Sequence, residues 1–152
     1  MFELFDHTAD LGLRVRASTF EELLVEAARG LLAMHVANPE AVRPLQTRTI
    51  EVTADDPSYL LFDWLSELVF ALEGEKLLLS EFDIAVNGGG TPRRAFPTAL
   101  GTGLTLSATC RGEPMDPARH QMDHEVKAIT YHGLKVEQQA DGSWFAELIV
   151  DI

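Results

Sequence analysis

Residues 11–35 read LGLRVRASTFEELLVEAARGLLAMH, and this stretch decides the fold class. Over 11–17, apolar residues alternate with other residues, a pattern that predicts a half-buried β-strand. Thr19 is followed three residues later by Glu22, which is the spacing of a capping box at a helix N-terminus. Apolar residues then recur every three or four positions, which predicts an amphipathic helix that ends before Pro39.

A second helix and several further strands are predicted downstream. Asp56 suits an N-cap and Pro57 suits the first helical position, so a helix is expected from there to Gly74. Strands are expected at 46–54, 76–86 (one or two), 104–110, 125–131, 133–139 and 144–150, with a hairpin turn at Asp141-Gly142 and a mobile loop or irregular hairpin tip over 88–103. This order predicts an α+β fold with mixed or antiparallel β-sheets and two main α-helices, in a single domain spanning 1–152.

The charge balance of the chain excludes several classes of function. Lys and Arg number 12 and Asp and Glu number 24, which gives a formal net charge of −12. Such a chain lacks the basic face that unaided nucleic-acid binding requires, and an anionic membrane would repel it. The balance favours binding of cations or docking onto a basic partner.

Cysteine usage and the N-terminus bear on the compartment. Cys110 is the single cysteine, so the chain can form neither an internal disulfide nor a thiolate zinc site. Its place in an alternating apolar segment predicts a buried and inert thiol. The first residues, MFELFDHTAD, fit neither a signal peptide nor a membrane anchor, and a cytoplasmic location is expected.

Acidic residues stand at both ends of the predicted strand framework. Asp10, with His7 nearby, comes directly before the first strand, where it is either a ligand or acid–base group or only a strand-end cap. The last strand runs into Asp151 and Ile152, whose carboxylate lies one residue from the Asp151 side chain. Two such groups repel each other unless a cation or a basic partner neutralises them, and carboxylate oxygens suit Ca²⁺, Mg²⁺ or Mn²⁺. The alternative is a pair of solvated carboxylates at a frayed chain end.

Histidines gather around the strand predicted at 125–131. His120, His124 and His132 lie within 13 positions, together with Glu125 and Lys127. They are candidates for metal ligands or proton carriers. No short His-x-His or Cys-x-x-Cys pair organises them, and the two charged residues would also make a plain ion pair on one strand face.

Three strings in the sequence resemble the archease family. They are DHTADLGL at 6–13, EVKAITYH at 125–132 and the terminal VDI at 150–152. The resemblance extends over essentially the whole chain and implies an archease-like fold. It also implies a divalent metal ion, with Ca²⁺ expected first and Mg²⁺ or Mn²⁺ as alternatives, held by Asp10, Asp151 and the carboxylate of Ile152. His7, Lys127 and His132 match the family strings as well and are expected beside the metal or at an interface.

Archeases are accessory proteins of the RtcB-type RNA ligase, so the resemblance implies an activator and not an enzyme. Such an activator promotes guanylylation of the ligase and multiple turnover in tRNA splicing and RNA repair, without direct binding to nucleic acid or membrane. Two other functions stay open from the residues. One is a general chaperone or partner-binding module with a purely structural metal, and the other is a small enzyme with Asp10, His124 or His132 as general base.

Overall fold

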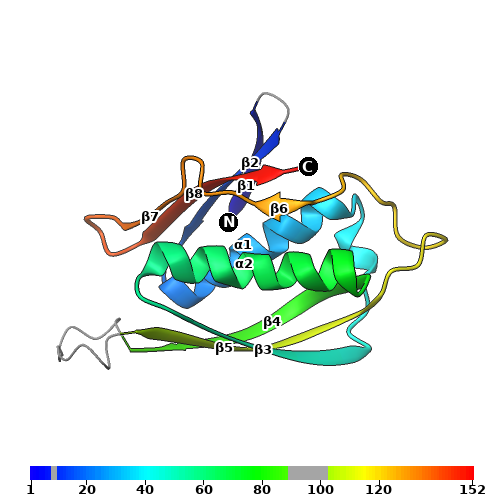
Figure 1. Ribbon diagram of the computed structural model, residues 1–152, viewed down its shortest axis with the longest axis horizontal. Helices are drawn as coiled ribbons and strands as arrows, with labels where there is room; N and C mark the ends of the chain where they lie inside the picture. Colours follow the sequence, from blue (N-terminus) through cyan, green and yellow to red (C-terminus); the bar gives the residue numbers. More distant parts are fainter. Residues whose placement is uncertain (8–9, 89–102) are drawn as a thin grey trace.

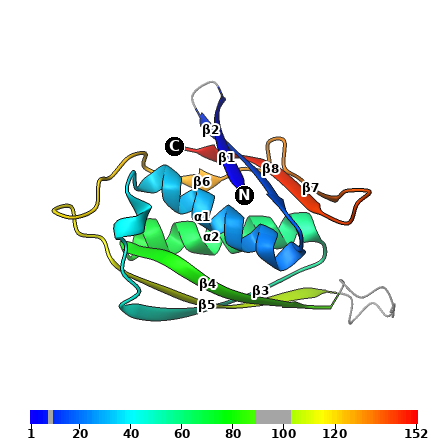
Figure 2. The ribbon, with the colours of Figure 1, turned by 180° about the vertical axis from the view of Figure 1, so that it is seen from behind.

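Two antiparallel sheets enclose two helices in a computed structural model that describes residues 1–7, 10–88 and 103–152 (Figures 1 and 2). The elements, in chain order, are β1 (Phe2–His7), β2 (Asp10–Ala17), α1 (Phe20–His35), the 3-10 turn η1 (Pro39–Ala41), β3 (Gln46–Ala54), α2 (Pro57–Gly74), β4 (Leu77–Asn87), β5 (Leu104–Pro114), β6 (Ala128–Ile129), β7 (Lys135–Gln138) and β8 (Trp144–Asp151). The predicted α+β class with two main helices is confirmed.

The larger sheet has five strands and the smaller has three. In the larger sheet the order is β1-β2-β8, and both β6 and β7 pair with β8 along the edge that faces away from β2. The smaller sheet has the order β3-β5-β4, and every pairing in both sheets is antiparallel. Helices α1 and α2 form the layer between the sheets (Figure 1).

Both helices begin at the residues that their caps predict. Thr19 Oγ1 accepts a hydrogen bond from the backbone N–H of Glu22 at 3.1 Å. The Glu22 carboxylate accepts from the backbone N–H of Ser18 at 3.4 Å, one residue before the position that a standard capping box would use. Asp56 accepts from the N–H of Tyr59 at 3.0 Å at the start of α2.

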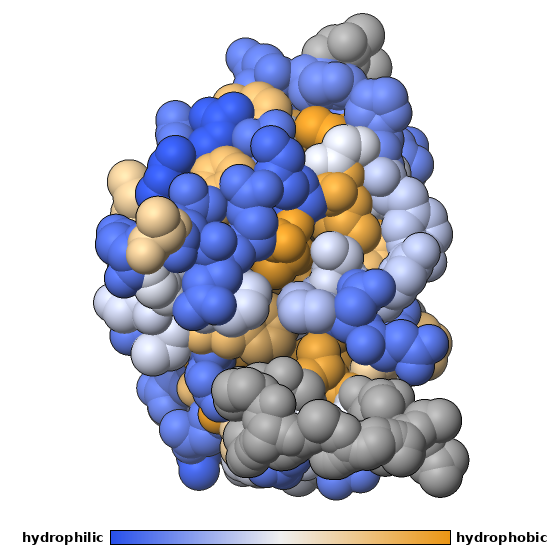
Figure 3. Space-filling view, turned by 90° about the vertical axis from the view of Figure 1, so that its left-hand side faces the viewer, coloured by the Kyte–Doolittle hydropathy of each residue, from blue (hydrophilic) through white to orange (hydrophobic). Residues whose placement is uncertain are grey.

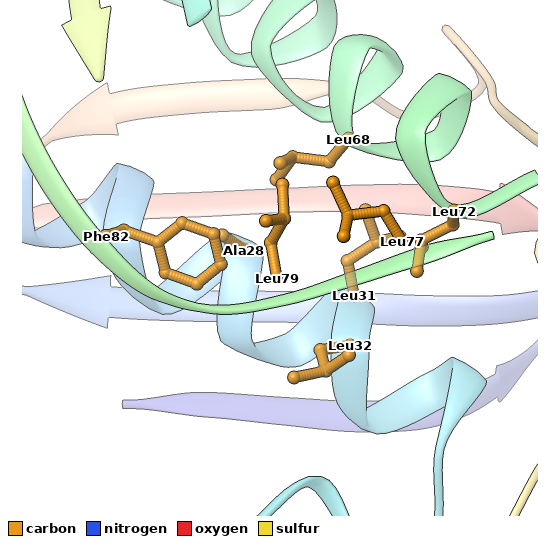
Figure 4. A pocket seen from close by; sticks show the side chains of 8 residues that line it. All are labelled: Ala28, Leu31, Leu32, Leu68, Leu72, Leu77, Leu79 and Phe82. Atoms are coloured by element: carbon orange, nitrogen blue, oxygen red, sulfur yellow. The ribbon is translucent and has the colours of Figure 1, made fainter. Parts of the chain in front are cut away.

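The core lies where the helices meet each other and the sheets. The indole Nε1 of the fully buried Trp64 in α2 donates to the carbonyl of Leu24 in α1 at 3.0 Å, which ties the two helices together. Beside them, leucines of α1, α2 and β4 surround a cavity of about 10 Å³ (Figure 4). Its lining is entirely apolar, and its volume is close to that of one water molecule, so it is a packing gap and not a ligand site. In the part of the chain that the structure describes, no helix is both long enough and apolar enough to cross a membrane.

Three predicted boundaries differ from the structure. β1 (2–7) was not expected. Phe5 of β1 points outward and lies across Gly12 of β2, with its ring 2.1 Å from where a Cβ on Gly12 would stand. An apolar residue on the outward face hides the alternation of apolar and polar residues that would have predicted this strand. β5 runs four residues past the predicted 110 because β3 and β4 pair with it on both sides.

The strand predicted over 125–131 shrinks to the two residues of β6. Before β6, the chain is bound to the end of α1 instead of the sheet. The backbone N–H groups of Asp123 and His124 donate to the carbonyls of His35 and Met34, at 2.8 and 3.0 Å. The 88–103 loop predicted from the sequence falls almost wholly outside the described residues.

Candidate metal centre

Strands β2 and β8 of the larger sheet meet at the ends that carry the predicted acidic residues. β2 runs antiparallel to β8, with Leu11 opposite Val150. The paired register ends at this step. Asp10 and Asp151 are the next residue on each strand, so continuing the register would bring them opposite each other; Asp151 itself pairs with Ala128 of β6. Figures 1 and 2 both show the end of β8 beside the β1–β2 hairpin and β6. Two residues from opposite ends of the chain thus become neighbours.

Both acidic residues belong to the outer face of the sheet, away from the helices. Side chains alternate between the two faces of a strand. Leu13 and Leu148 are opposite each other and fully buried, so their row faces the core. The next row faces outward, and there the Arg14 guanidinium donates to the Glu147 carboxylate at 2.9 Å. The same alternation places the two aspartates on this outer face.

His7 completes a row of three across the sheet. It stands opposite Asp10 in the β1–β2 hairpin, which puts it on the same face. Its Nδ1 is buried and has no hydrogen-bond partner among the described residues. Its ring centroid is 5.3 Å from that of the exposed His132. A buried nitrogen without a partner is costly, so its place opposite Asp10 suits a group that would bond to a ligand of an ion and not to the ion itself.

The end of the chain is held in place on the other side of β8. The backbone N–H of Lys127 donates to the backbone carbonyl of Asp151 at 2.8 Å, and the residue Lys127 is exposed. The Thr130 hydroxyl donates to the carbonyl of Ile149 at 2.9 Å. Ile152 is half-buried, and its side chain packs against the core. Its backbone position next to Asp151 is therefore defined.

No protein cation neutralises these carboxylates within the described ranges. The ion pairs there include neither Asp10 nor Asp151, and the nearby Arg14 is shared by Glu3 and Glu147. Over the same residues, no group of three or more His, Cys, Asp or Glu side chains is gathered closely enough to hold a metal ion. The predicted set contains only two such side chains, since its third member is a main-chain carboxylate. Oxygen donors of this kind suit Ca²⁺, Mg²⁺ or Mn²⁺.

Comparison with known proteins gives a consistent result along the whole chain. The model of the Archease protein family matches residues 2–152. The chain is 40% identical over 151 residues to the archease of Methanopyrus kandleri, covering 99% of each protein. It is 33% identical to the archease of Pyrococcus abyssi, covering 99% of this chain and 98% of that one. The chain belongs to the archease family. The solution structure of protein 1598 of Methanobacterium thermoautotrophicum superposes with a TM-score of 0.80 at 30% identity, over 99% of this chain and 98% of that structure.

The histidine cluster predicted over 120–132 is divided in this archease. His132 lies beside His7, whereas His120 is fully buried and bound to Glu113 at the other end of the 115–127 connection. His120 Nδ1 accepts the backbone N–H of Asp116 at 2.8 Å, so the ring proton is on Nε2, which donates to Glu113 at 2.9 Å. His120 thus anchors the connection, and the structure does not place it with the other site candidates.

Glu113 is a buried charge that the sequence reasoning missed. Only 3% of its surface is exposed, and two arginines, Arg43 and Arg119, bond its carboxylate together with His120. Burial acts to raise the pKa of Glu113, but the Arg43 backbone N–H and the side-chain donors outweigh it and lower the pKa to about 2. The sequence holds no signal for this group, because Arg43 lies 70 positions from its partner.

Two further features limit where chemistry can take place. Cys110 is completely buried, as predicted, and desolvation raises the pKa of its thiol to about 11. A pocket of about 210 Å³ lies in the apolar band between the two sheets, beside the rings of Phe20 and Trp144 (Figure 3). Trp144 begins β8 and Asp151 ends it, so this pocket is at the opposite end of the sheet from the carboxylates.

Proposed function

We propose that this archease activates an RtcB-type RNA ligase, promoting guanylylation of the ligase and multiple turnover during tRNA splicing and RNA repair. In this proposal the chain is an accessory protein without catalysis of its own, and it works in the cytoplasm. Membership of the archease family supports the proposal. The observation that supports its chemistry is the pairing of β2 with β8 up to Leu11 and Val150, the residues next to Asp10 and Asp151.

The proposed metal site consists of Asp10, Asp151 and the carboxylate of Ile152. A divalent ion bound there would offset the repulsion among these groups and present positive charge to phosphate oxygens. Ca²⁺ is the first expectation, with Mg²⁺ or Mn²⁺ as alternatives. His7 would hold the carboxylates in orientation through its unpartnered Nδ1. Lys127 fixes the backbone of Asp151 from the opposite side.

The charge of the chain supports action through a protein partner. With a net charge of −12, the molecule has little affinity for an RNA backbone. A ligase that binds RNA ends and a nucleotide must itself present basic groups and divalent ions to phosphates. An acidic protein is attracted to such a surface, and its outward carboxylate row can approach the ligase's own ions.

The direct test is the rate of ligase guanylylation with and without the protein, at limiting ligase and excess RNA. Asp151→Ala and an extension of a few residues after Ile152 should both abolish stimulation, because each removes or blocks a proposed ligand. Glu147→Gln is the matched control, because Glu147 lies in the same strand and faces outward, but pairs with Arg14. Normal stimulation by both site variants would refute the metal mechanism, and absence of stimulation by the unaltered protein would refute the proposed function.

A further inference from the structure

One face of α2 carries aromatic side chains that stay partly or largely exposed in the described structure. Helix positions 59, 62, 66 and 70 share a face, and three of them are aromatic. Tyr59 is 50% exposed and Phe70 is 62% exposed, although most of α2 is buried. Figure 1 shows this helix in front of α1, with β6 directly above it. A helix that is apolar on its outer as well as its inner side is usually covered by something.

Tyr131 extends this face from the sheet. It follows β6 and is 58% exposed. Its ring stacks on Phe62, with centroids 4.0 Å apart and planes 3° from parallel, and meets Tyr59 edge-on at 6.0 Å. We call Tyr59, Phe62, Phe70 and Tyr131 the aromatic face. Three of its four members are among the six large apolar side chains that are exposed in the described residues.

A groove runs along the aromatic face between α2 and β6. Its volume is about 590 Å³, and Phe62 and Phe70 line it on the helix side, with Lys127, Ala128 and Ile129 on the strand side. β6 is an edge strand, so the groove is bounded by a sheet edge as well as by aromatic rings. Such an arrangement can receive a segment or a surface of another protein.

The charges around the groove are predominantly negative. Asp63 and Glu67 stand one helical turn from members of the aromatic face, and Glu73 lines the groove itself. None of these three carboxylates takes part in an ion pair within the described ranges. Lys127 is the one cation in the groove lining. Aromatic rings bordered by unpaired carboxylates complement a basic protein surface, in particular arginine side chains.

The groove also adjoins the candidate metal centre. Ala128, which lines the groove, pairs directly with Asp151. Next in sequence to Tyr131, His132 has its ring beside that of His7. The aromatic face and the outward carboxylates therefore lie on either side of the β6 edge, and a partner that reaches around this edge contacts both.

We infer that the aromatic face is the docking surface through which this archease binds a basic surface of the RNA ligase, while the carboxylate end does the activating. This inference rests on the proposed function. It separates two roles by position: the aromatic face determines affinity for the ligase, and Asp10 and Asp151 determine the extent of stimulation at saturation.

The test measures ligase binding and guanylylation with the full chain. Phe70→Glu removes an exposed aromatic ring from the groove lining, and we expect the Kd for the ligase to rise roughly 30-fold or more, as at a binding hot spot. Guanylylation should reach the normal plateau once enough of the variant is added. Asp151→Ala should instead lower the plateau. Leu45→Glu is the matched control, because Leu45 is 63% exposed and lies outside the groove lining and the aromatic face; its Kd should stay within about threefold of the unaltered value.

The outcomes distinguish the inference from the proposed function. An unchanged Kd for Phe70→Glu, with stimulation by the unaltered protein intact, overturns the docking surface alone. If the unaltered protein neither binds nor stimulates the ligase, the proposed function is overturned. Sedimentation tests a second copy of the chain as the occupant of the face. If Phe70→Glu abolishes self-association and leaves the affinity for the ligase unaffected, the face binds a second copy and the inference is overturned. Circular dichroism checks the fold, and Tyr131→Ser provides a second variant with the same expectation should Phe70→Glu be unstable.

Discussion

Asp151→Asn should be more stable than the unaltered protein when no divalent ion is present, and less stable when one is bound. Continuing the register of β2 and β8 one step beyond Leu11 and Val150 brings Asp151 opposite Asp10. Like charges at opposite positions cost about 0.5–1 kcal/mol. Without an ion, the variant should be more stable by that amount, which raises Tm by roughly 1–4 °C for a chain of this length.

With the ion, the difference should change sign. At an ion concentration about 100 times its Kd, binding stabilises the folded protein by about 2.7 kcal/mol, provided that the unfolded chain does not bind it. The unaltered protein should therefore gain roughly 5–11 °C in Tm, and Asp151→Asn should gain little because one ligand no longer carries charge.

Calorimetry with a chelator and then with Ca²⁺, Mg²⁺ or Mn²⁺ measures both halves of this prediction. Glu147→Gln serves as the control, because it loses a bond to Arg14 and should be less stable by the same amount in every condition. The proposed metal site is refuted if none of the three ions raises the Tm of the unaltered protein. Repulsion between the two aspartates is refuted if Asp151→Asn is destabilising in the presence of chelator.

Three further experiments, two with variants and one with a thiol reagent, test the packing of the protein. Glu113→Gln should reduce the free energy of unfolding by about 2–3 kcal/mol at neutral pH, because it leaves Arg43 and its neighbours without a counter-charge. Because the pKa of Glu113 is lowered, its contribution to stability is complete above the ordinary value of 4.5 and is lost as the pH falls towards about 2. The free energy of unfolding from urea titration should therefore change less between pH 6 and pH 3 in the variant than in the unaltered protein. Gly12→Ala should cost about 1 kcal/mol by displacing the Phe5 ring, and it should be nearly neutral in a Phe5→Ala background, which a double-mutant cycle of thermal unfolding would show. Cys110 should resist alkylation by iodoacetamide in the folded protein and react at once in denaturant, and rapid labelling under native conditions would contradict its burial.

Local patterns were enough to predict the helices and most strands. Residues 46–54 and 57–74 have the predicted bounds, because alternation, an Asp N-cap and a Pro at the first helical position are all short-range signals. The prediction over 125–131 was wrong because its alternation is the same whether or not a partner strand is present. The backbone of Asp123 and His124, just before this range, is bonded to the end of α1, and only Ala128 and Ile129 pair with β8 as a strand. A local sequence pattern does not show which strands, far apart in the sequence, will pair.

For the site, composition could indicate only a preference for cations or basic partners. From the residues alone, Asp10 could be only a strand-end cap and Asp151 only a solvated carboxylate at a frayed chain end, since nothing in their own neighbourhoods links them. Resemblance to the archease family singled them out, and the β2–β8 register then explains how they become neighbours. The aromatic face was missed for a different reason: Phe62 and Phe70 have the spacing of core residues, and only the three-dimensional packing shows which side of α2 is left open.

The central position of β8 affects how this molecule can reach its native state. Arg14 and its partner Glu147 are 133 positions apart, and similar separations hold along the whole β2–β8 seam. Closing so long a loop costs chain entropy before any contact forms, so high contact order should make folding slow despite the two strong helices. Until β8 is seated, β2, β6 and β7 all present unpaired edges, and self-association competes most strongly at that stage.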